Sequence, residues 1–561
     1  MHMTGKQIIT AMLERHGVTC LAGIPGGANL PLYDALGASA RIRHILVRHE
    51  QAAGFIAQGW ARVTGEAGVC MATSGPGATN LITAVADAKL DSIPLVAITG
   101  QVPTSMIGTD AFQEVDTYGM TMSITKHNFL VRSAGELLDV MPDAFRIATS
   151  GRPGPVLIDV PKDVQNQSVE FDALPEPARP DPSPEADPED LARAVQMINQ
   201  AQRPILYIGG GVIASGASGS LRRLARKTGI PVTSTLMGLG AVPVDDRHYI
   251  GMLGMHGARH TNLAIEECDV LIAAGVRFDD RATGRVQQFC PHAKILHIDI
   301  DRSELHKIKA AHLAITGDIG AVLEALEPRL DATDRQAWNK RIAELKQMYP
   351  LEMPGLEDPF MPYGLIRQVA NLLDDDTPVV TDVGQHQMWV AQAYPFRRPR
   401  RWLTSGGLGT MGFGLPTAIG ATLARPETPA VLFTGDGSLL MNLQELATAA
   451  EEGLNVKVIV MNNESLGLVR QQQDLFYGQR CFAVQYRLRH DFCTVARGLG
   501  VQAIDLAEEN DPMEAMARAF TQPGPALINV PIEQTEDVYP MVPPGAPNKE
   551  MIGGQRHACV R

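Results

Sequence analysis

The chain has 561 residues, which is enough for about three to four domains of ordinary size. Its 49 Lys and Arg residues are outnumbered by 62 Asp and Glu residues, and the net charge of −13 argues against a nucleic-acid-binding protein. Phosphate-bearing ligands are not excluded, because backbone N–H groups can hold them. Apolar and charged contents of 45% and 20% indicate a globular chain rather than a disordered one.

The seven cysteines form no C-x-x-C pair, and their odd number is more typical of a reducing cytosol than of a disulfide-bonded secreted protein. No apolar run approaches the roughly 18 residues of a membrane-spanning helix, and the N-terminus lacks the basic and apolar regions of a signal peptide. We therefore expect a cytoplasmic protein with no membrane partner and no nucleic-acid partner.

Two breaks in the pattern divide the chain into domains. Residues 175–188 contain six prolines among acidic residues, a composition that predicts an extended linker. Residues 331–360 are polar, with one helical stretch around Arg335–Tyr349. The predicted units are domains at 1–165, 190–330 and 361–530, followed by a tail at 531–561.

All three blocks alternate short β-branched runs with helical patterns, which predicts buried parallel strands between helices. The fold class is therefore α/β, with three doubly wound parallel-sheet domains. The runs are Gly68–Thr73, Pro94–Thr99, Val156–Val160, Pro204–Ile208, Val270–Ala274, Ile295–Ile300, Val379–Asp382, Val431–Thr434, Val456–Met461 and Ala526–Val530.

A short repeat indicates that the first and third domains are related. Residues 153–161 (PGPVLIDVP) align with 523–531 (PGPALINVP) at seven of nine positions, and each segment ends its block. We interpret the repeat as the trace of an internal duplication.

The most informative motif is Gly435-Asp436-Gly437, which follows one predicted strand and precedes a helical pattern at Leu439–Glu451. Twenty-four residues separate Gly437 from the pair Asn462-Asn463, which follows the next strand. Both motifs then lie at the carboxyl ends of parallel strands, where ligands bind. The Asp436 carboxylate, the Asn463 amide oxygen and the backbone carbonyl of Ser465 form an oxygen set that suits Mg²⁺. Gly435 and Gly437 would let the backbone approach phosphates.

This spacing resembles the thiamine-diphosphate motif, whereas G-D-G alone would be an ordinary turn. Thiamine diphosphate also requires a carboxyl group that hydrogen-bonds to its aminopyrimidine ring. Glu50 is the candidate, because it lies between a strand and a helix in Arg48-His-Glu-Gln51, downstream of Gly23-Ile-Pro-Gly-Gly27. Taken alone it would be a solvated helix start, and the resemblance changes that interpretation.

The resemblance extends over nearly the whole chain. The sequence is similar to the catalytic large subunits of the acetohydroxyacid synthase (acetolactate synthase) family, and among them to the type I bacterial isozymes. Besides the strings above, the match is carried by 73–80 (TSGPGATN), 100–103 (GQVP), 107–114 (IGTDAFQE), 125–128 (TKHN), 151–155 (GRPGP), 161–165 (PKDVQ), 381–389 (TDVGQHQMW) and 405–414 (SGGLGTMGFG).

The resemblance implies a reaction. Pyruvate is decarboxylated on thiamine diphosphate, and the hydroxyethyl group is condensed with a second 2-ketoacid. The product is 2-acetolactate or 2-aceto-2-hydroxybutyrate, in branched-chain amino-acid biosynthesis. The two halves of the site meet across a subunit interface in this family, which implies a homodimer or a dimer of dimers. A separate small regulatory subunit is also implied.

The resemblance assigns site residues by position. Gln113, with Phe112, should line the site from the partner subunit, Lys162 the substrate channel, and Arg281 should pair with the acceptor carboxylate. The implied catalytic residues are Glu50, Gln113, Lys162, Arg281 and Met388. Those implied for binding thiamine diphosphate are Gly26, Gly27, Gly75, Val383, Gly384, Gln385, His386, Gly409, Met411, Gly435, Gly437 and Ser438.

The middle block resembles the FAD-binding domain of the family, although no G-x-G-x-x-G pattern is present. The string at 277–281 (RFDDR) distinguishes it from catabolic acetolactate synthases, which do not need FAD. The implied FAD-binding residues are Arg152, Gly210, Gly211, Leu236, Met255, His256, Gly275, Arg277, Asp279, Asp299, Ile300 and Asp318. Loops that approach two large cofactors also explain why glycine is as frequent as 53 residues.

One position departs from the family pattern. Most members carry a tryptophan that shapes the acceptor pocket, and here Gln472 stands in its place. We expect little preference for 2-ketobutyrate over pyruvate, because a large apolar wall is missing.

The sequence disfavours three other functions. A glyoxylate carboligase is disfavoured because that family lacks the catalytic glutamate, whereas Glu50 is present here. An FAD-dependent pyruvate oxidase of the same architecture is disfavoured by the RFDDR and TKHN strings. A non-catalytic cofactor-binding protein is disfavoured because Glu50 and Asp436 are both present. The tail at 531–561 is predicted to help close the active site as a lid.

Overall fold

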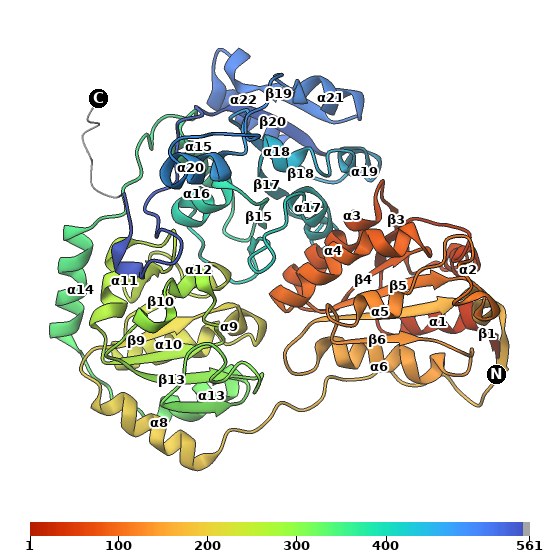
Figure 1. Ribbon diagram of the computed structural model, residues 1–561, viewed down its shortest axis with the longest axis horizontal. Helices are drawn as coiled ribbons and strands as arrows, with labels where there is room; N and C mark the ends of the chain where they lie inside the picture. Colours follow the sequence, from red (N-terminus) through yellow and green to blue (C-terminus); the bar gives the residue numbers. More distant parts are fainter. Residues whose placement is uncertain (554–561) are drawn as a thin grey trace.

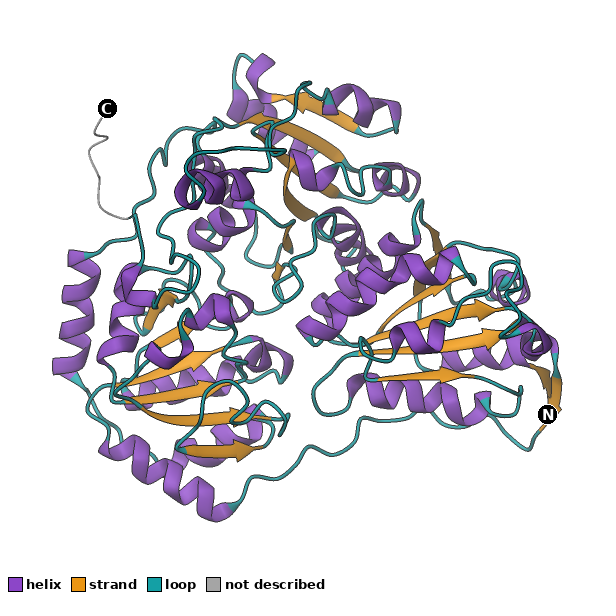
Figure 2. Ribbon diagram, viewed as in Figure 1, coloured by secondary structure: helices purple, strands orange, loops and turns teal. Residues whose placement is uncertain are grey.

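The computed structural model describes residues 1–553 and shows three α/β domains arranged in a triangle (Figure 1). In that view the first domain is red to orange, the middle domain yellow to green, and the third teal to blue. Each domain has a six-stranded sheet with helices packed around it (Figure 2). All strand pairs within these three sheets are parallel, so the predicted fold class is confirmed.

The sheet of the first domain has the order β3-β2-β4-β5-β7-β6, and a separate antiparallel pair joins β1 to β8. Its strands are β1 His2–Thr4, β2 Cys20–Gly23, β3 Arg43–Leu46, β4 Gly68–Ala72, β5 Leu95–Gln101, β6 His127–Leu130, β7 Pro155–Pro161 and β8 Ser168–Glu170. Its helices are α1 Gly5–Arg15, α2 Leu30–Gly37, α3 Glu50–Thr64, α4 Pro76–Asp91, α5 Thr117–Thr121, α6 Leu137–Thr149 and α7 Lys162–Asn166, with a 3₁₀ turn at Thr104–Met106.

The middle domain has the order β11-β10-β9-β12-β13-β14. Its elements are α8 Pro188–Gln200, β9 Pro204–Ile208, α9 Gly210–Ala214, α10 Ser218–Thr228, β10 Val232–Ser234, β11 Tyr249–Met252, α11 Arg259–Glu267, β12 Val270–Ala274, α12 Asp280–Thr283, β13 Lys294–Asp299, β14 Leu313–Thr316, α13 Ile319–Leu326 and α14 Gln336–Met348, with 3₁₀ turns at Leu236–Gly238, Val286–Gln288 and Glu327–Arg329. Counted along the chain, the order is 3-2-1-4-5-6, which is the order of dinucleotide-binding sheets.

The third domain has the order β16-β15-β17-β18-β20-β19. Its elements are α15 Pro362–Asn371, β15 Val379–Thr381, α16 Gln385–Ala393, β16 Trp402–Leu403, α17 Gly414–Ala424, β17 Ala430–Gly435, α18 Asp436–Leu439, α19 Glu445–Glu451, β18 Val456–Asn462, α20 Gly467–Phe476, α21 Phe492–Gly498, β19 Gln502–Asp505, α22 Pro512–Thr521 and β20 Ala526–Pro531, with 3₁₀ turns at Leu506–Glu508 and, in the tail, Asn548–Glu550.

The first and third sheets have the same topology. Counted along the chain, both run 2-1-3-4-6-5, and the repeated segments form β7 and β20, which occupy the same place in the two sheets. The correspondence reaches individual side chains. Asp159 on β7 accepts a hydrogen bond from Gln101 at the end of β5, and Asn529 on β20 accepts one from Asn462 at the end of β18. These matches support the internal duplication.

The strands predicted from apolar runs all exist, with ends that differ by no more than about two residues. The helix predicted at Leu439–Glu451 was wrong, because the chain there forms α18, a turn and then α19. In the turn, the Asn442 side chain donates hydrogen bonds to the Gly412 carbonyl (2.6 Å) and to Gln51 (3.1 Å). Tertiary hydrogen bonds at this point take precedence over the helical pattern.

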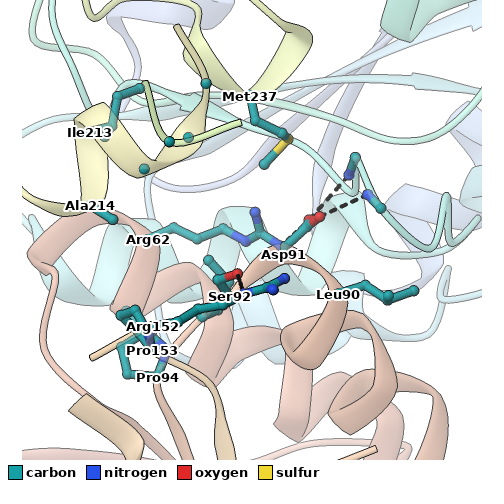
Figure 3. A pocket seen from close by; sticks show the side chains of 18 of the residues that line it. Arg62, Leu90, Asp91, Ser92, Pro94, Arg152, Pro153, Ile213, Ala214 and Met237 are labelled. Atoms are coloured by element: carbon teal, nitrogen blue, oxygen red, sulfur yellow. Dashed lines mark hydrogen bonds and ion pairs between the residues drawn. The ribbon is translucent and has the colours of Figure 1, made fainter. Parts of the chain in front are cut away.

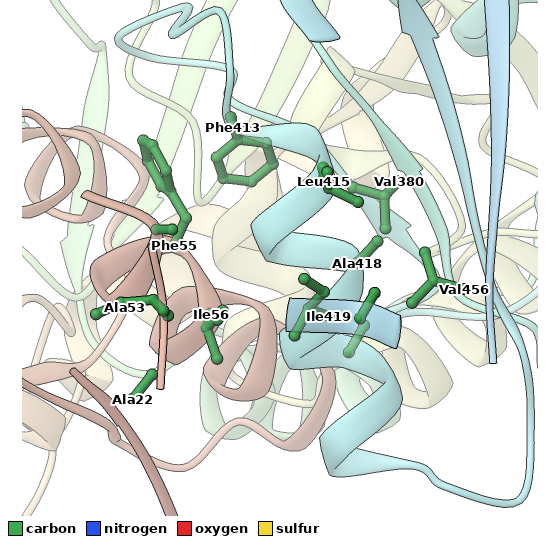
Figure 4. Close-up of a cluster of buried hydrophobic side chains, with 14 of the residues drawn as sticks. Ala22, Ala53, Phe55, Ile56, Val380, Phe413, Leu415, Ala418, Ile419 and Val456 are labelled. Carbon is green, nitrogen blue, oxygen red and sulfur yellow. The ribbon is translucent and has the colours of Figure 1, made fainter. Parts of the chain in front are cut away.

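The first and third domains share one hydrophobic core, which is formed where α3 packs against α17 (Figure 4). The two helices touch backbone to backbone at glycines. A Cβ on Gly59 would overlap the carbonyl oxygen of Thr417, and a Cβ on Gly420 would overlap that of Ile56. Only glycine permits this approach, so the glycine pair determines how closely the related domains pack.

The proline-rich segment between Phe171 and Asp187 contains no helix or strand, as its composition predicts, and it runs along the edge of the molecule from the first domain to the middle one (Figure 1). Ion pairs from Arg15 to Glu176 and from Arg146 to Asp181 hold it against the first domain. Of the predicted tail at 531–561, residues 554–561 lie outside the described residues.

The described part of the tail, residues 531–553, crosses from α20 to the middle domain. Gln471 on α20 makes two hydrogen bonds with the backbone of Val538, at 2.9 and 3.0 Å. The backbone N–H of Val542 donates to the carbonyl of Met255 at 2.8 Å. The tail therefore lies next to two of the elements predicted to form the site.

Candidate active site

The predicted metal ligands meet at the carboxyl edge of the third sheet. Asp436 follows β17 and Asn463 follows β18, and these strands are neighbours. The backbone N–H of Ser465 lies 3.1 Å from Asp436 Oδ2 and 3.2 Å from Asn463 Oδ1, so it brings the two side-chain oxygens together. Asn463 is oriented by its amide nitrogen, which donates to Gln385 Oε1 at 3.1 Å. Burial raises the pKa of Asp436 to about 6, and a bound divalent cation would oppose that effect.

This oxygen set is not a cluster of the usual metal-binding side chains. Within residues 1–553, no group of three or more His, Cys, Asp or Glu residues is placed to hold a metal ion. One carboxylate, one amide oxygen and backbone carbonyls suit a hard cation that completes its shell with phosphate oxygens and water. The arrangement therefore fits Mg²⁺ bound together with a diphosphate.

The side chain of His386 points to the place of that diphosphate. It is buried, and its Nε2 has no hydrogen-bond partner among the described residues. Burial lowers the pKa of His386 to about 3, so the ring is neutral and can donate one hydrogen bond. A Cβ on Gly435 would lie 3.0 Å from His386 Nδ1, so glycine keeps the space in front of the ring open. With its proton on Nε2, the ring would donate to a phosphate oxygen beside the metal ligands and so supply the partner that Nε2 lacks.

The remaining diphosphate-side residues surround the same point. Ser438 Oγ donates to the carbonyl of Val383 at 2.9 Å, which joins α18 to the loop before α16. Gly384 and Gln385 stand at the start of α16, and Gly437 at the start of α18. The structure thus brings together all the residues predicted for the metal and the diphosphate.

A loop at residues 404–411, here called the cofactor loop, carries the two residues predicted to contact the aminopyrimidine. It follows β16 and contains neither helix nor strand. Gly409 is exposed and has a φ of +70°, and nothing lies within 4 Å of where its Cβ would be. Met411 is half-buried beside it.

The predicted residues of the first domain form a second group at the carboxyl edge of their own sheet. Glu50 is the first residue of α3, and Asn80 Nδ2 donates to its Oε2 at 2.9 Å. Gly75 and Gln113 are in contact, since a Cβ on Gly75 would lie 2.8–3.0 Å from three atoms of Gln113. Lys162 begins α7, directly after β7.

Gly26 belongs to the same group, and a Cβ there would lie 2.6 Å from the side chain of Thr73. Its neighbour Gly27 is exposed, and nothing lies within 4 Å of where its Cβ would be.

The two groups are not joined within the chain. In the part of the chain that the structure describes, no hydrogen bond or ion pair links the first-domain group to the metal ligands or to the cofactor loop. Glu50 is half-buried, and Phe112 is 88% exposed.

A cavity of about 1340 Å³ lies between the three domains. All twelve residues predicted to bind FAD line it, and the eleven in the middle domain lie at the carboxyl edge of its sheet, where the strand order reverses. Gly211 and Gly275 bring two backbone segments of the cavity wall close together, because a Cβ on Gly211 would lie 2.7 Å from the Cα of Gly275. A cavity of this size at the switch point of a dinucleotide-type sheet fits FAD.

Arg152 reaches the cavity from the first domain, as predicted (Figure 3). Its guanidinium pairs with Glu304 at 2.6 Å and with Asp301 at 3.3 Å, and its Nε donates to Ser92 at 2.8 Å. Burial raises the pKa of the neighbouring Asp299 to about 6, an effect that Arg152 opposes.

The same cavity extends to the third domain. Arg281 and Met388 line it, together with Gln472 and Leu468 on α20. Arg281 is mostly exposed, with its nearest carboxylate, Asp280, at 3.8 Å. The predicted acceptor residues and the predicted flavin residues therefore line one and the same cavity.

Sequence reasoning missed a buried ion cluster beneath the cofactor loop, formed by Arg62, Asp87 and Asp91. The spacing of the two aspartates on a helical pattern was visible, because residues four apart share one face. The loop residues that bind these aspartates, Gly406 and Thr410, lie more than 300 residues away in the chain, and no local pattern points to them.

Three family models match the chain. They are the thiamine pyrophosphate enzyme N-terminal TPP binding domain at residues 3–120, the central domain at 191–326 and the C-terminal TPP binding domain at 382–530. In residues 1–553, no helix is long and apolar enough to cross a membrane.

Curated relatives match almost the whole chain. The acetolactate synthase isozyme 1 large subunit of Escherichia coli (strain K12) is 57% identical over 550 residues, 98% of each chain. The isozyme 2 large subunit of the same organism is 46% identical over 551 residues, 98% of this chain and 99% of its own. Acetolactate synthase 1, chloroplastic, of Nicotiana tabacum is 45% identical over 565 residues, 98% of this chain and 84% of its own.

Proposed function

Because the chain belongs to the acetolactate synthase large subunits of the thiamine pyrophosphate enzyme family, we propose that the residues described above form its active site. The protein is a thiamine-diphosphate-dependent acetolactate synthase, which joins two 2-ketoacids with loss of CO₂. The relatives named above are all acetolactate synthases, so the pyruvate oxidase alternative is set aside.

One observation supports the site most strongly. Asp436, Asn463 and the unpartnered His386 converge at one edge of the third sheet. The direct test is to incubate the purified protein with pyruvate, thiamine diphosphate, Mg²⁺ and FAD. With inorganic phosphate and O₂ also present, so that either reaction can proceed, we expect acetolactate and CO₂, and formation of acetyl phosphate and peroxide instead would overturn the assignment.

The third domain would hold the diphosphate end of the cofactor. Asp436, Asn463 and the Ser465 carbonyl would ligate Mg²⁺, while His386 and the backbone around Gly384 and Gly437 would donate to phosphate oxygens. When bound, thiamine diphosphate supplies the carbon nucleophile and the electron sink that decarboxylation needs. The protein contributes position and electrostatics.

Glu50 would act on that cofactor from a second subunit. Its carboxyl group is oriented by Asn80, and it would hydrogen-bond to the aminopyrimidine ring and hold a proton there. We propose a homodimer, or a dimer of dimers, because the two groups of site residues are separate within one chain. Exposed apolar side chains near both groups support this interface, including Phe112, Ile107 and Leu408.

In such a dimer, Gln113 would line the pocket beside Glu50, and Lys162 would line the channel by which substrate enters. Arg281 would pair with the carboxylate of the acceptor ketoacid, for which a guanidinium fork is well suited. Met388 lines the same cavity as Arg281 and would limit the space for the acceptor. Met411 would support the bent form of the cofactor by packing.

The acceptor preference would be set in part by Gln472, which lines the cavity from α20. Its amide offers less apolar surface than the tryptophan of most relatives in the family. A pocket distinguishes one extra methylene only by about 1–3 kcal/mol, and here the wall that would do so is missing. We expect pyruvate and 2-ketobutyrate to be used with similar efficiency.

FAD would occupy the cavity of the middle domain, with Arg152 and the glycines at 209–211 and 275 around it. The Escherichia coli relatives are named large subunits, which supports a further proposal that a small regulatory subunit binds this chain. We also propose a cytoplasmic location, consistent with six free cysteines in the described residues.

A further inference from the structure

The buried ion cluster of Arg62, Asp87 and Asp91 lies where the first domain meets the third. Figure 3 shows Arg62 and Asp91 of this cluster. Arg62 is near the end of α3, and both aspartates are in the last two turns of α4. Arg62 Nη2 lies 2.8 Å from Asp91 and 3.3 Å from Asp87, and the three side chains are at most 6% exposed. One guanidinium therefore forms ion pairs with two carboxylates in a buried site.

The Asp91 carboxylate binds the backbone of the cofactor loop. Its Oδ1 accepts from the N–H of Gly407 at 2.7 Å, and its Oδ2 accepts from the N–H of Gly406 at 3.1 Å (Figure 3). Arg62 Nη1 donates to the carbonyl of Thr404 at 3.0 Å, just before these glycines. Two successive N–H groups and one carbonyl of the loop are thus held by charged side chains of the other domain.

The Asp87 carboxylate binds side chains of the same loop. Its Oδ2 accepts hydrogen bonds from the hydroxyls of Ser405 and Thr410, the latter at 2.9 Å. The Ser405 oxygen in turn accepts from the N–H of Thr410 at 2.9 Å. Asp87 therefore closes the loop on itself, joining its beginning to its end.

The third domain itself holds the start of the loop, because Gln387 Nε2 donates to Thr404 Oγ1 at 2.7 Å and to the carbonyl of Ser405 at 3.1 Å. The hydrogen bonds that the described structure gives residues 406–410 go to the ion cluster or stay within the loop. It contains no helix or strand, and residues 407–409 are exposed. Gly406 and Gly407 supply little side-chain packing of their own, and Gly409 has open space around it. Charge-assisted hydrogen bonds in a desolvated site are stronger than neutral ones, so the ion cluster is the main constraint on residues 406–410 of the loop.

We propose that Asp87 and Asp91 are positioning residues that hold the cofactor loop in the conformation that receives the aminopyrimidine half of thiamine diphosphate. Arg62 supplies the positive charge that lets two carboxylates stay buried side by side. The proposal rests on the function proposed above, because Gly409 and Met411 are assigned to the aminopyrimidine there. It adds residues that touch neither substrate nor cofactor and act through the loop.

The proposal predicts a selective effect, because the two halves of the cofactor are held by different parts of the chain. The diphosphate half depends on Asp436, Asn463 and His386, none of which bonds to the ion cluster among the described residues. Loss of the cluster should therefore weaken binding of thiamine diphosphate but spare binding of inorganic diphosphate. A general loosening of the domain would weaken both.

The experiment compares binding of Mg²⁺–thiamine diphosphate and Mg²⁺–inorganic diphosphate by isothermal titration calorimetry on the full chain. For Asp91→Ala we expect the dissociation constant for thiamine diphosphate to rise about tenfold, with that for diphosphate within about twofold of wild type. Asp91→Asn should fall between, because its amide oxygen can still accept one of the two backbone N–H groups. If Asp91→Ala does not fold, Thr410→Val removes a single hydrogen bond to Asp87 without removing a charge.

Lys457→Met is the matched control. Lys457 is fully buried near the start of β18, at the amino ends of the strands and so away from the predicted metal ligands. Its ammonium donates to the carbonyls of Gln522 and Gly524. Its loss should lower the melting temperature while leaving both dissociation constants within about twofold. This variant shows the effect of losing a buried charge elsewhere in the protein. That effect can then be distinguished from the effect of losing the bonds that hold the cofactor loop.

Two results would overturn the proposal. One is an unchanged affinity of Asp91→Ala and Thr410→Val for thiamine diphosphate, and the other is an equal loss of affinity for both ligands. If the wild type still makes acetolactate in that case, the proposed function stands and only the positioning role fails. If the wild type binds no thiamine diphosphate at all, both fail.

Discussion

Replacing Gly59 by alanine tests whether the first and third domains depend on direct backbone contact between α3 and α17. The added Cβ would overlap the carbonyl oxygen of Thr417 and lie 3.0 Å from the amide nitrogen of Ala421. Both are backbone atoms and cannot rotate away, so the helices must separate. Overpacking a core costs about 1–3 kcal/mol, a clash with backbone atoms belongs at the upper end of about 3 kcal/mol, and alanine regains about 1 kcal/mol of helix propensity.

We therefore expect Gly59→Ala to lose roughly 2 kcal/mol of stability, which is about 4–8 °C in melting temperature for a unit of this size. Activity should fall as well, because Glu50 begins the same helix. The matched control is Gly37→Ala at the end of α2, where nothing lies within 4 Å of the new Cβ. That variant should be stabilised by up to about 1 kcal/mol. Thermal unfolding of both variants is the assay, and a Gly59→Ala protein that melts at or above wild type would refute the reasoning.

Three further outcomes are expected. Gln472→Trp should raise the ratio of 2-aceto-2-hydroxybutyrate to 2-acetolactate about fourfold when equal amounts of the two acceptors compete, since one buried CH₂ contributes about 0.8 kcal/mol; an unchanged product ratio would count against it. Asn463→Ala should raise the Mg²⁺ concentration needed for half-maximal activity about tenfold or more, and a normal Mg²⁺ titration would show that this side chain is not a ligand. Burial raises the pKa of Asp159 to about 7, so the stability linked to this group is present below its unfolded pKa of 3.8 and is lost as the pH rises towards 7. As the pH is raised from 5 to 8, Asp159→Asn should therefore gain roughly 3 kcal/mol of stability relative to wild type. A difference in melting temperature between the two proteins that stays constant over this pH range would contradict this.

Local sequence patterns predicted much of the fold. Runs such as Pro204–Ile208 and Val270–Ala274 are strands with those very ends, because a continuous apolar run of that length suits a strand covered on both faces. The helix predicted at Leu439–Glu451 failed for a non-local reason. Asn442 bonds to Gly412 and Gln51, and these partners lie in another loop and another domain.

The site was predictable where its residues follow strands directly. Asp436 and Asn463 stand at the ends of adjacent parallel strands, so strand prediction alone brings them to one edge. The flavin cavity was less accessible to sequence reasoning, since the middle domain lacks the usual glycine pattern and its strand order appears only in three dimensions. The resemblance to a known family, rather than any spacing, identified Arg152 and Arg277 as lining residues.

The ion cluster shows most clearly what cannot be predicted from the sequence alone. Arg62, Asp87 and Asp91 resemble surface charges of two amphipathic helices when only the sequence is considered. Their burial depends on a loop from another domain whose backbone N–H groups carry no sequence signature. Such sites require the tertiary structure.

The most direct test of the account is complementation between two variants that each lack one half of the site. Glu50→Gln and Asp436→Ala should each be inactive when expressed alone. If every site combines Glu50 of one subunit with Asp436 of the other, co-expression with random pairing gives half mixed dimers with one intact site each, and about a quarter of wild-type acetolactate formation. No recovery above the two separate variants would contradict a site shared between subunits.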